Sequence, residues 1–235
     1  IMTYKLTVKT IAKRHGLYAS FMPKPKYGMC GSGMHINMSL FNKEGQNIFV
    51  DENDKNGLSK EAYNFIAGLM KHMRSMTAII NPIVNSYKRL VPGYEAPTYI
   101  AWSATNRSPL IRVPAARGLG TRVELRSPDC ATNPYLAIAV CLAAGLDGIK
   151  NNLQPVDSIQ RDIYSMTDEE RDEAGIENLP KNLYEAIQEM RKSDFVKGVL
   201  GKEVFKKYIK AKEEEWMEYT SQVTDWEIDR YLGRI

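Results

Sequence analysis

The chain opens with a helical spacing of apolar residues and then loses it. Residues 2–15 form an amphipathic pattern that predicts a helix ending at Gly16. Residues 18–50 lack this period. Within them, residues 34–40 alternate between apolar side chains and three polar ones, which are His35, Asn37 and Ser39. An alternation of period two predicts a strand with one polar face.

Two longer helices are predicted beyond this strand. Residues 59–80 carry an apolar face, and Asn81-Pro82 ends it because the residue before a proline avoids helical backbone angles. Asn133-Pro134 combines a capping side chain with a proline at the first helical position. The helix that follows, to residue 150, is apolar nearly all round, which predicts that it is buried.

Residues 83–130 are interrupted by proline and glycine and predict short strands and long loops. Apolar runs lie at 99–102 and 110–113. Residues 121–126 alternate again, and one face of this predicted strand carries Arg122, Glu124 and Arg126.

The last third, residues 151–235, predicts helices. Thr167 with Glu170 and Asn182 with Glu185 have the spacing of capping boxes, and residues 202–231 predict one long charged helix. Strands followed by helices indicate an α+β fold with a helical C-terminal third.

Composition narrows the class of protein. The chain has 235 residues, 43% hydrophobic and 26% charged, as a globular protein does. Three cysteines without a CxxC motif argue against a disulfide framework or a zinc site, and predict a reducing compartment, the cytoplasm. The longest run without strongly polar residues, 135–146, is too short to span a bilayer, and no secretory signal opens the chain. A first residue of isoleucine within an early helix predicts a piece of a longer protein.

Charge is concentrated in one window. From Lys88 to Arg126 there are seven basic and two acidic residues, and no lysine occurs between Lys88 and Lys150. A guanidinium group keeps its charge and matches two oxygens of a phosphate or carboxylate, so arginine alone predicts recognition of such anions. An ordinary basic surface is the alternative. A nucleic-acid module is disfavoured, because the net charge is only +4 and the window lacks aromatic residues interleaved on a common face.

Three groups of residues could perform chemistry. A glycine-rich stretch, 28–33, leads into His35, although a single histidine on a strand more often has a structural role. Glu124 lies between Arg122 and Arg126; such a carboxylate suits a hard cation like Mg²⁺, and the alternative is a charge ladder worth ~0.2–1 kcal/mol per pair. Residues 87–97 predict a shaped loop with Glu95 at its tip. Without a Walker or Rossmann motif, this set predicts phosphoryl or carboxylate chemistry.

At this point the motifs resemble a known family. Residues 85–97 resemble the glutamate flap of glutamine synthetase, and residues 24–39 resemble its ATP-region signature. Further blocks of the same family match at 106–108, 112–114, 122–126 and 133–136. The resemblance covers essentially the whole chain, as the C-terminal half of a bacterial class I enzyme. It implies part of one catalytic domain of the glutamine synthetase and guanido kinase type, with an antiparallel sheet segment flanked by helices.

The resemblance also implies a reaction: ATP, glutamate and ammonia give glutamine through γ-glutamyl phosphate, with Mg²⁺ or Mn²⁺. It implies that His35 and Glu124 bind the metal, that Glu95 closes the flap and takes a proton from ammonium, and that Arg107, Arg112 and Arg126 stabilise the transferred phosphoryl group. Glutamate would be held by Gly31, Arg89 and Arg126, and the nucleotide by Ser39, Arg112 and Arg122. No role is implied for Arg117.

The family further implies twelve subunits in two six-membered rings, with each site shared between neighbours. The N-terminal domain and the first half of the catalytic domain are expected outside residues 1–235, which are expected to divide into the sheet, loops and buried helix of 1–150 and the helices of 151–235. The chain alone is expected to be inactive. Lys26 and Cys30 depart from the family pattern, in which a hydrophobic residue and Asn are usual. The alternatives are a γ-glutamyl-polyamine ligase and a non-catalytic ring protein of synthetase descent.

Overall fold

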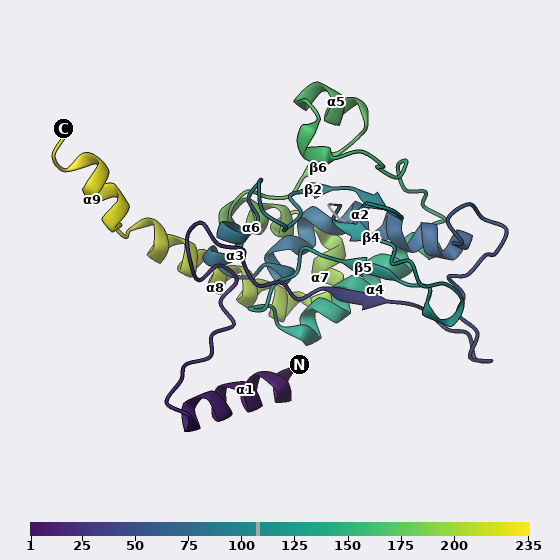
Figure 1. The fold of residues 1–235 in the computed structure, drawn as a ribbon, viewed down its shortest axis with the longest axis horizontal. Coiled ribbons are helices and arrows are strands. Elements are labelled where there is room, and N and C mark those ends of the chain that lie inside the picture. The colour runs from purple at the N-terminus through teal and green to yellow at the C-terminus, as the bar shows by residue number, and fades with distance from the viewer. Residues whose placement is uncertain (107–108) are drawn as a thin grey trace.

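A computed structural model describes residues 1–106 and 109–235 (Figure 1). It confirms an α+β architecture, in which a small sheet lies against a group of helices. The described helices are α1 (Met2–Arg14), α2 (Lys60–Ile80), α3 (Val84–Arg89), α4 (Pro134–Lys150), α5 (Asp168–Glu173), α6 (Leu183–Arg191), α7 (Asp194–Leu200), α8 (Lys202–Thr220) and α9 (Asp225–Tyr231), with short 3-10 turns η1 (Gly118–Gly120) and η2 (Ile163–Ser165). No described helix is long and apolar enough to cross a membrane.

The main sheet has the strand order β1-β5-β4-β3, from β1 (Ile36–Met38), β5 (Val123–Leu125), β4 (Ile111–Arg112) and β3 (Trp102–Ser103). β5 pairs antiparallel with both β1 and β4, as expected, but β3 and β4 run parallel, so the sheet is mixed. A second pair joins β2 (Tyr99–Ile100) to β6 (Glu177–Asn178). The strand expected over residues 34–40 is shorter at both ends.

The core is organised around α2. Ser59 caps this helix by accepting a hydrogen bond from the Ala62 amide at 3.2 Å, and the helix ends at Asn81, as its sequence predicts. Its apolar face is fully buried, including Phe65, Leu69 and Met73. Helix α4 packs closely against it at Gly148, where an added Cβ would collide with the Asn64 carbonyl of α2. This close approach explains why glycine occupies a position inside α4.

Three helix predictions need correction. Helix α4 begins at the Asn133 cap as expected, but only one side of it is buried; the opposite side exposes Tyr135, Ile138, Leu142 and Leu146. Apolar composition all round therefore did not mean burial all round. The long C-terminal helix is two helices, because Thr224 and Glu227 form a capping box that starts α9 after a break. Helix α3 lies where strands and loops were expected.

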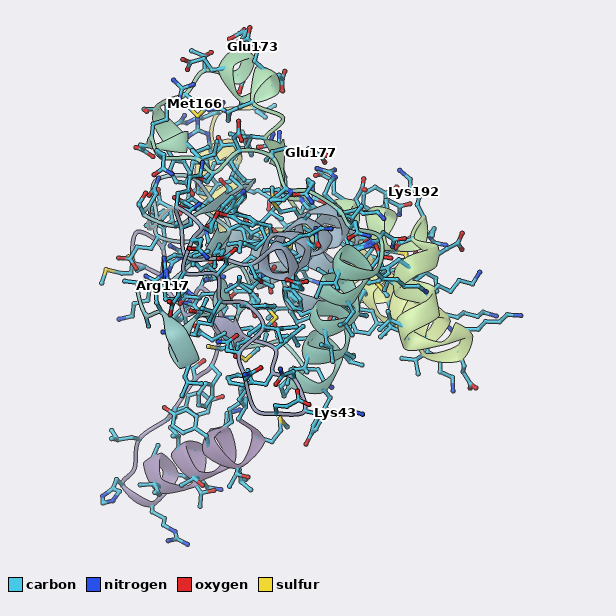
Figure 2. All side chains as sticks on the ribbon, turned by 90° about the vertical axis from the view of Figure 1, so that its right-hand side faces the viewer. Lys43, Arg117, Met166, Glu173, Glu177 and Lys192 are labelled. Atoms are coloured by element: carbon cyan, nitrogen blue, oxygen red, sulfur yellow. The ribbon has the colours of Figure 1, made fainter. Side chains whose placement is uncertain are left out.

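Several parts extend from the central body, among them α9, which buries none of its residues and ends at the upper left of Figure 1. Helix α1 buries none of its residues. An extended segment connects it to the body, at the lower left of Figure 1. At the opposite end, the segment that contains η2, α5 and β6 projects from the body, and we call it the excursion. Figure 2 labels Met166, Glu173 and Glu177 in it. A second small apolar cluster joins Ile163, Met166 and Ile176 of this excursion to Ala101, which lies between β2 and β3. The capping box predicted at Thr167 is present, whereas Asn182 caps its helix by accepting a hydrogen bond from the Glu185 amide at 2.8 Å.

Candidate active site

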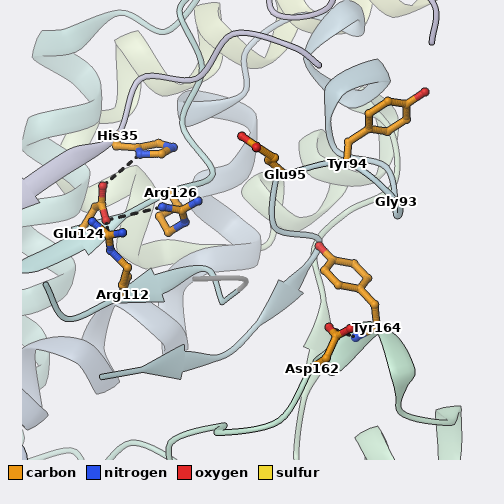
Figure 3. Close-up of a pocket in the computed structure, with 9 residues that line it drawn as sticks. All are labelled: His35, Gly93, Tyr94, Glu95, Arg112, Glu124, Arg126, Asp162 and Tyr164. Atoms are coloured by element: carbon orange, nitrogen blue, oxygen red, sulfur yellow. Dashed lines mark hydrogen bonds and ion pairs between the residues drawn. The ribbon is translucent and has the colours of Figure 1, made fainter. Parts of the chain in front are cut away.

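The register of β1 and β5 brings the two expected metal ligands together. Asn37 lies opposite Glu124 in this antiparallel pair, and His35 sits just before β1. The His35 Nδ1 atom is 3.0 Å from Oε1 of Glu124 (Figure 3). The Glu124 side chain is buried, with 8% of its surface exposed, whereas the His35 side chain keeps 36%. The pair thus has a fixed carboxylate base and an imidazole that faces the cavity.

Two arginines surround the buried carboxylate. Arg112 is opposite Glu124 in the β4–β5 pair, and its Nε lies 2.6 Å from Oε2 of Glu124. These two atoms form an ion pair without hydrogen-bond geometry, so Oε2 has no hydrogen-bond partner among the described residues. Arg126 approaches the same oxygen at 3.7 Å from the other side. The carboxylate therefore lies among positive charges, as the sequence predicts, but its second arginine is Arg112 and not the expected Arg122.

The electrostatics keep the imidazole available as a ligand. Burial lowers the pKa of His35, and the positive charge of Arg126 lowers it further, while Glu124 acts in the opposite direction. A histidine with a lowered pKa is neutral near pH 7, and a neutral ring nitrogen can bind a metal ion. Burial also lowers the pKa of Arg126, an effect that Glu124 and Glu95 oppose.

These side chains line a cavity of about 760 Å³ (Figure 3). Its wall is formed by His35, Gly93, Tyr94, Glu95, Arg112, Glu124, Arg126, Asp162 and Tyr164. Glu95 projects into the cavity from its loop, on the side opposite Glu124 in Figure 3. The cavity thus places an exposed acid across from the imidazole–carboxylate pair.

A neighbouring cavity of about 370 Å³ shares His35, Glu95 and Arg126 with the first and adds Cys30, Gly31 and Arg89. Arg89 is 5% exposed and donates hydrogen bonds to the carbonyls of Ser127, at 2.6 Å, and Arg126, at 3.2 Å. Burial lowers its pKa, and the buried Asp129 opposes this shift. An added Cβ on Gly33 would lie 2.6 Å from Nη2 of Arg89, so the glycine-rich stretch provides the room that this arginine needs.

Not every expected site residue reaches these cavities. Among the described residues, Ser39 and Arg122 line neither one. Ser39 follows the end of β1, and Arg122 donates from Nε to Asn37 at 2.9 Å and from Nη1 to the Gly120 carbonyl at 3.0 Å. Arg117 is occupied with the Pro114 and Ala116 carbonyls. Arg107 lies outside the described residues.

Sequence reasoning missed two residues of the cavity wall, Asp162 and Tyr164. Both come from the excursion, at η2, more than thirty residues after the last arginine of the basic window. Neither stands in a pattern that indicates chemistry. Only the fold of residues 151–166 across β3 brings them here, through hydrogen bonds such as the one from Trp102 Nε1 to the Val156 carbonyl at 2.7 Å.

The donor set fits a hard divalent cation. An imidazole and a carboxylate are ligands that Mg²⁺ or Mn²⁺ accepts, and the buried Oε2 of Glu124 lacks a hydrogen-bond donor. The described residues contain no cluster of three or more such ligands. An ion held by His35 and Glu124 would need its other ligands from water, from substrate oxygens or from residues elsewhere.

Fold and site together define a catalytic domain that gathers arginines around an imidazole–carboxylate pair. The chain belongs to the glutamine synthetase catalytic domain family, whose model matches residues 1–231. Its relatives include glutamine synthetases of Clostridium saccharobutylicum, 62% identical over all of this chain and 53% of the relative, and of Methanosarcina mazei, 57% identical over all of this chain and 52% of the relative. The chain therefore spans about half the length of the curated relatives it matches.

Solved structures agree with this assignment. The chain is similar to a structure described as GmaS without ligand, with a TM-score of 0.86 and 39% identity over 98% of this chain and 52% of that one. A GmaS complex with ADP gives a TM-score of 0.87 and 38% identity over 98% of this chain and 53% of that one.

Proposed function

We propose that this chain forms part of an active site that joins ammonia to glutamate, with ATP as the phosphoryl donor. The observation that carries this proposal is the His35–Glu124 pair, 3.0 Å apart and flanked by Arg112 and Arg126 at the wall of one cavity. Charge of this kind, fixed before the substrate arrives, is what phosphoryl transfer requires. The family membership supplies the substrates.

We assign a role in this reaction to each of the site residues. Arg112 and Arg126, with Arg107, neutralise the negative charge that develops as the γ-phosphoryl group moves to the γ-carboxylate of glutamate. Arg126, Arg89 and Gly31 hold the glutamate in the smaller cavity, where they lie together. Glu95 accepts a proton from ammonium, and the resulting ammonia attacks the acyl carbon of γ-glutamyl phosphate and displaces phosphate.

A divalent cation bound by His35 and Glu124 would supply further positive charge to the ATP phosphates. Nucleotide binding is supported by the similarity to a structure determined as an ADP complex. Ser39 and Arg122 stay in the proposal as nucleotide contacts beyond the two cavities.

The activity is proposed for a longer protein, of which this chain is the C-terminal part of one catalytic domain. His35 and Glu124 alone supply too few ligands for a divalent cation, and the arginines line only part of the proposed site. We therefore expect the isolated chain to form no glutamine. A ring of subunits is the proposed assembly, and the exposed apolar side chains of α9 offer a surface for such contacts. A cytoplasmic location is proposed from the three free cysteines.

The test is an assay of the whole protein with glutamate, ATP, Mg²⁺ or Mn²⁺, and ammonium. Formation of glutamine with stoichiometric release of phosphate is expected, and its loss in Glu124→Gln is expected as well. A polyamine or another amine replaces ammonium in a parallel assay. Turnover with the amine and not with ammonium would overturn the choice of ammonia, and no turnover with any acceptor would support a non-catalytic ring protein.

A further inference from the structure

The side chain of Tyr164 reaches the loop that carries Glu95. It enters the main cavity from η2, and in Figure 3 its hydroxyl points at the chain just beyond Glu95. That hydroxyl donates a hydrogen bond to the carbonyl of Ala96 at 3.1 Å. Ala96 is the neighbour of Glu95 and is 5% exposed, so the bond fixes the backbone next to the exposed acid.

The opposite side of Glu95 is held as well. The Lys24 ammonium lies 3.5 Å from the ring centre of Tyr94, and Lys24 is itself buried and bonded through its amide to Asn85 at 2.8 Å. A cation over an aromatic face is an attractive contact. Glu95 is therefore flanked on each side by a residue whose position is fixed by a partner distant in sequence.

The backbone that carries Tyr164 is held in place by the packing of its neighbours. Its neighbour Ile163 is 1% exposed within the apolar cluster of the excursion. The amide of Tyr164 itself donates to Oδ1 of Asp162 at 3.1 Å. The ring of Tyr164 packs against that of Tyr99 at 5.5 Å between centres, and Arg171 covers Tyr99 at 4.9 Å. Burial raises the pKa of Tyr164, so the hydroxyl keeps its proton and remains a donor.

We propose that Tyr164 is a positioning residue for Glu95, acting through its hydrogen bond to the Ala96 carbonyl. This rests on the proposed function of Glu95 as acceptor of the ammonium proton. A carboxylate on an exposed loop tip samples many positions, and proton transfer requires one within hydrogen-bond reach of its donor. The Tyr164 hydroxyl narrows the range of positions of Glu95 through the Ala96 backbone and not through the carboxylate itself.

The matched variants are Tyr164→Phe and Tyr99→Phe, which remove one hydroxyl each from adjacent rings. Loss of one neutral hydrogen bond predicts a fall of about 2- to 10-fold in kcat/KM for ammonium in Tyr164→Phe. The KM for ATP should stay unchanged, because the proposed role of Glu95 concerns ammonium and not the nucleotide. Tyr99→Phe should behave as the unaltered protein. In a Glu95→Gln background, Tyr164→Phe should add no further loss.

Amide hydrogen exchange of residues 90–98 provides a readout that needs no activity. Faster exchange in Tyr164→Phe, and not in Tyr99→Phe, is expected. If the whole protein forms no glutamine but this difference in exchange is seen, the proposed reaction fails and the loop contact stands. Unchanged exchange in Tyr164→Phe, or an equal loss of ammonium kinetics in both variants, would overturn the role of Tyr164.

Discussion

Nδ1 of His35 lies 3.0 Å from Oε1 of Glu124 although 89 positions separate the two residues. The antiparallel register of β1 and β5 produces this contact, because it sets Asn37 opposite Glu124 and leaves His35 on the same edge of the site. The imidazole is thereby oriented by a buried carboxylate, and Arg112 of β4 and Arg126, just after β5, meet at that same carboxylate.

Replacing Glu124 by Gln should weaken metal binding. The amide keeps the size of the side chain but loses the charge that a divalent cation needs. We expect a loss of Mn²⁺ affinity at least as large as the ~10- to 100-fold that follows removal of a partner outside the ligand shell. Titration of the whole protein with Mn²⁺, followed by electron paramagnetic resonance, measures it. Glu177→Gln, at an exposed position on β6, is the control and should bind Mn²⁺ normally.

Removing the charge of Arg112 should slow phosphoryl transfer more than it weakens folding. Its Nε is paired with Glu124 at 2.6 Å and its side chain is 29% exposed to the cavity. Arg112→Ala is expected to lower kcat by about 10²–10³, as for other preorganised charged groups. Arg112→Lys should recover only part, because an ammonium lacks the guanidinium fork. Arg161→Ala, at an exposed arginine, should leave kcat intact; an equal effect there would contradict the assignment.

Gly31→Ala should destabilise the protein and raise the KM for glutamate. An added Cβ would collide with the Pro23 carbonyl and lie 3.1 Å from Cγ of Arg89. Overpacking of this kind costs about 1–3 kcal/mol in the free energy of unfolding. Gly198→Ala is the matched change, since its Cβ meets open space inside α7 and should stabilise by about 0.5–1 kcal/mol. Urea unfolding distinguishes the two, and equal shifts would refute the steric account.

His72 should make stability depend on pH. Its Nε2 donates to Oδ2 of Asp147 at 2.8 Å, its ring stacks on Phe195 at 3.7 Å between centres, and burial lowers its pKa despite that carboxylate. Below its unfolded value of 6.5 the unfolded chain binds the proton more readily, so stability falls as pH drops from 6.5 toward the folded pKa. His72→Gln should show a smaller loss of unfolding free energy between pH 7.5 and pH 5.5. An identical loss in the variant would exclude His72 as the cause.

The sequence predicted the local elements whose causes are local. Asn133 and Thr167 cap the helices that they were expected to cap, because a capping side chain bonds to amides only two or three residues away. The alternation around Glu124 likewise predicted both a strand and its charged face. His35 and Glu124 were predicted as partners only through resemblance to a family, since no spacing rule relates two strands so far apart.

Tertiary structure decided the rest. Burial of one side of α4, the parallel pairing of β3 with β4 and the approach of Tyr164 to Ala96 each depend on which surfaces meet. The order of side chains along the chain determines local structure, such as a helix cap or the two faces of a strand. Contacts between distant segments depend instead on the register and packing of the whole fold, and the cavity wall was completed by residues that carry no pattern of their own.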